Sequence, residues 1–173
     1  MKTILTKPLG LRKKPWEGIS DYKCVAILDS TKDNIKRAVI DKAAHLFSIH
    51  SVAFAIIWFW DGGASLDYYR KKLASITLVS NRDDYLLYEI KSVLDIENLI
   101  SIWGDCDDLN IIFPQNADTW RSITKETFYK SYNKYCNDVI SRITSSNAIV
   151  SDTGDGEEAE FIVSNALFEK VFC

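Results

Sequence analysis

Short apolar runs alternate along this chain with segments in which apolar residues recur every three or four positions. The run at 24–28 ends in polar residues, which predicts a buried strand. Residues 32–48 have helical spacing behind a Ser-Thr pair that caps the helix. The run at 52–60 is apolar throughout, as in a central strand covered on both faces. This strand, helix and strand form a unit whose strands pair either in parallel, through a right-handed crossover, or antiparallel.

The middle of the chain fits either a hairpin or a long helix. Polar residues 81–84 form a turn between strands at 76–80 and 85–90, or they cap one helix that runs from 84 to 103. Strand-forming residues alternate after the turn, which favours the hairpin. The other elements predicted here are a helix beginning at Ser65, a short amphipathic helix at 96–103 and a strand at 109–113.

The C-terminal third contains the strongest helical pattern, a stripe of aromatic and aliphatic residues over 125–143. After it, 148–150 and 161–163 pair across a glycine-containing loop, or 157–172 form a helix with acidic residues at its N-terminus. The pattern does not decide between these two. The whole chain predicts one α/β or α+β domain over 1–173, with a mixed sheet of about five or six strands packed with about three or four helices. Residues 1–20 are a basic lead-in segment.

Composition indicates a soluble protein of the cytoplasm. A chain of 173 residues with 47% hydrophobic content is long enough to build one core. Its longest apolar run has nine residues, about half of what a bilayer crossing needs, and its beginning lacks a secretory signal pattern. The four cysteines are too widely spaced for a CxxC motif and too few for a disulfide scaffold. We expect reduced thiols, no membrane contact and no cofactor.

Charge is distributed unevenly. The net charge of −3 argues against direct binding of nucleic acid, which normally needs a basic face. The first fourteen residues carry five bases and no acid. The segment 152–160 does the reverse, and such asymmetry favours a partner of opposite charge. Its carboxylates are Asp152, Asp155, Glu157, Glu158 and Glu160.

Two other carboxylates give an enzymatic alternative. Asp29 and Asp61 each follow a predicted strand, and the carboxyl ends of parallel strands are where α/β proteins bind ligands. On neighbouring parallel strands the pair would hold a magnesium ion against a phosphate, as in a metal-dependent phosphoester or nucleotide enzyme. No glycine-rich phosphate motif follows either strand. Structural roles are therefore favoured, with Asp29 in a helix cap and Asp61 in a turn.

Aromatic residues near chain turns are candidate anchors for a partner, because exposed rings contribute strongly to interfaces. These are Trp16, Trp120, Tyr68 and Tyr69. Together with the charge pattern, they lead to the prediction of a non-catalytic protein-binding domain, of the bacterial immunity type, that neutralises a basic toxin such as a nuclease domain. Its carboxylates would stand in for nucleic-acid phosphates. The predicted partner-binding residues are Asp152, Asp155, Glu157, Glu158, Glu160 and Trp120, and no catalytic or metal-binding residue is predicted.

Overall fold

A computed structural model describes residues 3–5, 21–59, 65–81, 85–106, 108–121, 146–153 and 158–173. Within these ranges the chain forms eight strands and five helices. The strands are β1 (Thr3–Leu5), β2 (Tyr22–Leu28), β3 (Ala53–Trp58), β4 (Thr77–Asn81), β5 (Tyr85–Ile90), β6 (Asp108–Pro114), β7 (Ser146–Thr153) and β8 (Glu158–Ser164). The helices are α1 (Lys32–His50), α2 (Leu66–Lys72), α3 (Val93–Ser101), α4 (Ala117–Arg121) and α7 (Asn165–Phe172).

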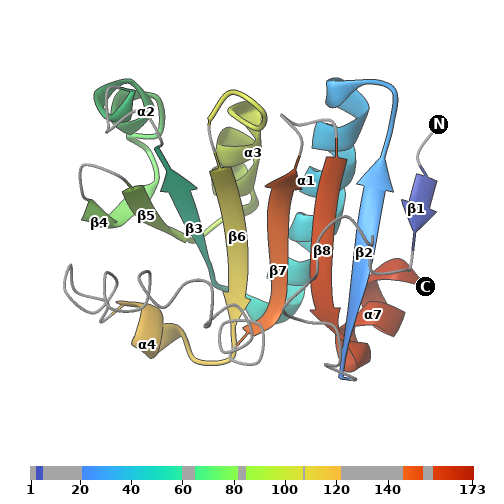
Figure 1. The fold of residues 1–173 in the computed structure, drawn as a ribbon. Coiled ribbons are helices and arrows are strands. Elements are labelled where there is room, and N and C mark those ends of the chain that lie inside the picture. The colour runs from blue at the N-terminus through green and yellow to red at the C-terminus, as the bar shows by residue number, and fades with distance from the viewer. Residues whose placement is uncertain are drawn as a thin grey trace.

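All eight strands belong to one sheet, in the order β1-β2-β8-β7-β6-β3-β5-β4, and every neighbouring pair is antiparallel. Helices α1, α3 and α7 lie against one face of this sheet, which we call the first face (Figure 1). Helix α4 lies on the opposite side, against the second face (Figure 1). The α/β prediction is confirmed, with more strands than expected, but the described strands form an antiparallel sheet and not the predicted mixed one.

Local sequence explains why α1 begins and ends where it does. The Oγ1 of Thr31 accepts a hydrogen bond from the backbone N–H of Asn34 at 3.3 Å, which caps the first turn. At the other end Ser51 adopts a left-handed φ of 62°, and its N–H donates to the Phe47 carbonyl. The residues predicted from helical spacing face the sheet and are buried: Ile35, Ala38, Val39, Ala43 and Leu46.

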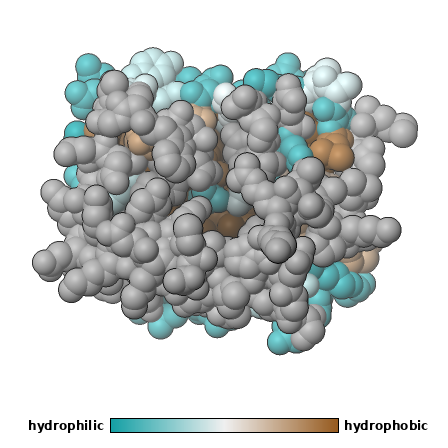
Figure 2. Space-filling model, viewed as in Figure 1, coloured by the Kyte–Doolittle hydropathy of each residue, from teal (hydrophilic) through white to brown (hydrophobic). Residues whose placement is uncertain are grey.

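The central strands are apolar on both faces because both faces are buried. In β3, Ala55 and Ile57 belong to the large cluster on the first face, whereas Phe54 and Ile56 belong to a smaller cluster on the second face. Successive side chains of a strand point to opposite faces, so burial on both sides requires an unbroken apolar run. Figure 2 shows mostly hydrophilic described residues at the two ends of the sheet, with apolar surface visible between them.

The strand pairing decides between the alternatives at two places in the chain. Strands β4 and β5 form the predicted hairpin, with Leu78 opposite Tyr88. Strands β7 and β8 also pair, with Val150 opposite Phe161. The alternative helix over 157–172 is therefore wrong in its first half, and a helix occupies only its last eight residues, as α7. Helix α3 also starts at Val93, three residues before the predicted start, because Ser92 and Asp95 form a capping box.

The predicted strand-helix-strand unit is present, but its strands are not neighbours. Strands β8, β7 and β6 lie between β2 and β3, and four antiparallel steps leave β2 and β3 pointing the same way. Within the predicted basic lead-in, Thr3–Leu5 pair with β2 as an edge strand. The predicted helix at 125–143 lies outside the described residues. No helix in the described part of the chain is long and apolar enough to cross a bilayer.

Candidate functional site

Acidic residues occupy one end of the sheet, where β2 and β7 finish and β8 and β6 begin. Leu28 of β2 and Thr153 of β7 both lie opposite Glu158 of β8. Asp108 is the first residue of β6, the next strand after β7 in the sheet. No Lys or Arg occurs within three residues of any of these four strand ends. Between β7 and β8 the sequence adds Asp155 and Glu157, which lie outside the described residues. We call this the acidic end, with Asp29, Asp108, Asp152 and Glu158 as its members on the strand ends.

Asp29 contributes a permanent negative charge to the acidic end. The Asn34 side-chain amide donates to its Oδ1 at 2.9 Å, and the Thr31 backbone N–H donates at 3.1 Å. These hydrogen bonds favour the charged form, the Asn34 bond most, and they lower the pKa of Asp29 to about 2. The carboxylate is therefore ionised at neutral pH, and it lies beside the predicted helix cap, where it accepts a hydrogen bond from the capping residue Thr31.

Glu160, which was predicted to bind the partner, does not lie on the surface. It is the third residue of β8, where alternation turns its side chain onto the second face, and it is buried. The thiol of Cys24 donates to its Oε1 at 2.7 Å. Its carboxyl group is thus held inside the protein. Glu158, at the beginning of the same strand, is half-buried, and Asp152 occupies the next-to-last position of β7.

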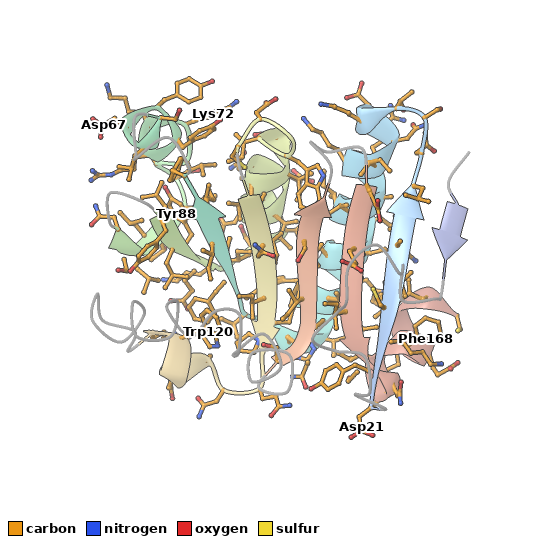
Figure 3. All side chains as sticks on the ribbon, viewed as in Figure 1. Asp21, Asp67, Lys72, Tyr88, Trp120 and Phe168 are labelled. Atoms are coloured by element: carbon orange, nitrogen blue, oxygen red, sulfur yellow. The ribbon has the colours of Figure 1, made fainter. Side chains whose placement is uncertain are left out.

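Trp120 is also buried, which contradicts its predicted role as an exposed anchor. Figure 3 shows it between α4 and the sheet, and its ring stacks on that of Phe54 with centroids 5.8 Å apart. Helix α4 needs an apolar contact to dock on the second face, and Trp120 supplies it. Of the other aromatic candidates, Tyr69 is buried, Tyr68 is exposed, and Trp16 lies outside the described residues.

A polar row on the second face was not predicted. Asn110, Ser151 and Glu160 lie opposite one another on β6, β7 and β8. The Ser151 hydroxyl donates to Asn110 Oδ1 at 2.6 Å, and Cys24 bonds Glu160 from the fourth strand. Polar side chains of this row therefore take part in hydrogen bonds with side chains of neighbouring strands. The signal in the sequence was a lone polar residue, Asn110, inside the apolar run 109–113.

The enzymatic alternative loses its geometric premise. It requires Asp29 and Asp61 to follow neighbouring strands, but β2 and β3 are four strand positions apart, roughly 19 Å at about 4.8 Å per step. Asp61 itself lies outside the described residues. Across the ranges that the structure describes, no group of three or more His, Cys, Asp or Glu side chains is placed to hold a metal ion.

Comparison with known proteins finds no matching family model, no similar curated protein and no similar solved structure.

Proposed function

We propose that this protein is a non-catalytic binding domain of the immunity type, which captures a basic protein partner such as a nuclease toxin domain at its acidic end. The observation that carries the proposal is the alignment of four acidic positions on adjacent strand ends without an intervening base: Asp29, Glu158, Asp152 and Asp108.

The spacing of the strands makes these charges act together. Neighbouring strands are about 4.8 Å apart, whereas the screening length at physiological salt is about 8 Å. The potentials of adjacent carboxylates therefore add before salt screens them. A surface of this kind steers a cationic partner and accelerates its association.

The strand ends also supply rigidity. Asp152 and Glu158 belong to paired strands of one hairpin, so the backbone at both positions is fixed before any partner arrives. A pre-organised surface loses less conformational entropy on binding than a free acidic loop. Nuclease domains present cationic clefts to nucleic-acid phosphates, and a row of acidic residues on fixed strand ends occupies such a cleft by the same electrostatic attraction.

The test compares two variants that remove the same number of negative charges. The first replaces acidic-end residues with amides: Asp152→Asn, Asp155→Asn, Glu157→Gln and Glu158→Gln. The control replaces exposed carboxylates on other elements: Asp21→Asn, Glu97→Gln, Asp118→Asn and Glu169→Gln. Of these, Asp21 precedes the first residue of β2, whereas the acidic end lies where β2 finishes, so Asp21 is at the opposite end of the sheet (Figure 3).

Tagged wild type and both variants are used to capture proteins from the native cell lysate at low and moderate salt. We expect wild type and control to retain one stoichiometric basic protein that the acidic-end variant loses. With the purified pair, the acidic-end variant should associate about tenfold more slowly or worse at low salt. Equal association rates for the two variants, or no basic protein on the wild type, would overturn the proposal.

A further inference from the structure

The acidic end adjoins a surface of opposite charge on α2. Helix α2 carries Arg70, Lys71 and Lys72 in its last turn against a single acid, Asp67, so its net charge is +2. The whole chain has a net charge of −3, which makes this helix a local excess of positive charge. All four residues are exposed, and α2 lies at the same end of the sheet as the last residues of β2 and β7 (Figure 1).

Contacts between described residues hold α2 beside the acidic end. Trp58, the last residue of β3, pairs with Asp108, a member of the acidic end. The next residue, Phe59, packs its ring against that of Tyr69 with centroids 5.5 Å apart. The Tyr69 hydroxyl donates to the Asp105 carbonyl at 2.6 Å, just before β6 begins. A buried tyrosine therefore fixes the positive surface next to the negative one.

The exposed side of α2 has the features of a binding surface. Tyr68 is 59% exposed, yet its ring lies edge-on to that of Tyr69 at 5.1 Å and 5.7 Å from Lys72 Nζ. Tyrosine and arginine are enriched among the residues that anchor interfaces. In the part of the chain that the structure describes, Lys71 and Lys72 form no ion pair. Their charges are available to the carboxylates of another molecule.

We propose that two copies of this chain associate about a two-fold axis, with α2 of each copy against the acidic end of the other. A two-fold axis repeats each contact, so a surface with adjoining positive and negative halves is complementary to itself. The partner is a second copy because this chain itself carries both of the charges that the contact needs. The two equivalent contacts close the pair, so association stops at the dimer.

The dimer regulates the acidic end, and in this respect the inference rests on the proposed function. A second copy covers the surface that the basic partner needs, so the two compete, and binding of the partner releases monomers by mass action. The two proposals fail separately. Self-association is measured on the pure protein, whereas the proposed function depends on capture of a basic protein.

Sedimentation equilibrium of the full chain under reducing conditions measures the association, from about 5 to about 500 µM protein. Contacts made mostly by surface charges are weak, so a Kd on the order of 100 µM is expected at low salt. Because salt screens such charges, the Kd should rise at least about tenfold between about 20 and about 300 mM salt.

A matched pair of double variants locates the contact. Lys71→Glu with Lys72→Glu reverses the charge of α2, and Lys91→Glu with Lys170→Glu reverses two exposed lysines elsewhere, one after β5 and one on α7. At low salt the α2 variant should raise the Kd at least about tenfold and the control by less than about twofold. Circular dichroism verifies that both variants fold.

A charge exchange between two variants gives the sharpest test. Asp152→Lys with Glu158→Lys makes the acidic end basic, so this variant repels its own α2 across the two-fold axis. Mixed with the α2 variant, it restores opposite charges at both contacts, and a heterodimer should form although neither variant dimerises alone. A monomer at the highest concentration in low salt, equal weakening by the control, or no heterodimer between folded variants would each overturn the proposal.

Discussion

The two faces of the sheet are buried by different kinds of side chains. On the first face the strands meet α1, α3 and α7 through one large aliphatic and aromatic cluster. On the second face two smaller apolar clusters are accompanied by the buried carboxylates Glu89 and Glu160. Each carboxylate accepts hydrogen bonds from a side chain of another element, Arg121 and Cys24 respectively.

This difference teaches where a polar residue is tolerated in a buried strand. A packed helix offers few free donors along its apolar stripe, so a carboxylate beneath α1 would lose its hydration without compensation. On the second face the register places donors within reach, as it does for Ser151 and Asn110. First-face stability should therefore come from apolar burial, and second-face stability partly from particular hydrogen bonds.

The largest loss of stability is expected from a substitution that leaves a cavity in the core on the first face. Phe161 is fully buried, and its ring lies edge-on to Phe172 of α7 with centroids 5.4 Å apart. Phe161→Ala should lower the free energy of unfolding by about 3–5 kcal/mol, the usual cost of such a truncation. Urea denaturation measures this, with the half-buried Phe172→Ala as a milder control. A loss no larger than that of the second-face variant below would refute the contrast between the faces.

An intermediate effect is expected from the ion pair on the second face. Arg121 donates to Glu89 from Nε at 3.0 Å and from Nη2 at 2.8 Å, and it also donates from Nη1 to Asp118 at 3.0 Å. The Glu89 side chain is 10% exposed, whereas that of Asp118 is 87% exposed. Glu89→Gln should therefore cost about 1–2 kcal/mol, and Asp118→Asn less than about 0.5 kcal/mol.

Chemical denaturation of both variants against the wild type measures this difference, and the two substitutions are matched because each removes one carboxylate from the same arginine. Equal losses would mean that burial does not decide the value of these ion pairs, and that the second face depends on its apolar contacts alone.

The elements that the sequence predicted well are those whose burial is visible in local spacing. The stripe of α1 and the unbroken run of β3 both record which sides are covered, and both were predicted within about two residues. Strand order was not predictable, because nothing local to β2 indicates that its neighbour is β8, more than a hundred residues later in the chain.

Two of the predicted partner-binding residues are buried for a related reason. Polar or turn-like surroundings made Glu160 and Trp120 candidates for partner binding, but strand alternation and the docking of α4 bury both. The acidic segment was recognisable from composition, whereas its continuation through Asp29 and Asp108 depends on pairing between distant strands. Register determines which side chains share a face or an end, and register is a long-range property.

The smallest effect should come from the one half-buried imidazole against the first face. His50, at the end of α1, has its ring 5.9 Å from that of Phe113, and its buried Nε2 has no hydrogen-bond partner in the described part of the chain. Burial lowers the pKa of His50 below its ordinary value of about 6.5. The unfolded chain therefore binds a proton more readily than the folded one, so stability is complete above about pH 6.5 and falls as the pH drops below it.

Replacing this residue by His50→Gln should remove part of the stability difference between about pH 7.5 and about pH 5.5, whereas His45→Gln, at an exposed position of the same helix, should leave it unchanged. Urea denaturation of the three proteins at both pH values measures the difference. The effect should be small because the ring is not fully buried and because a cation at a helix C-terminus gains some energy from the helix dipole. If His50→Gln loses as much stability on acidification as the wild type, the pH dependence does not come from His50 on the first face. It would then originate in carboxylates, two of which are buried on the second face.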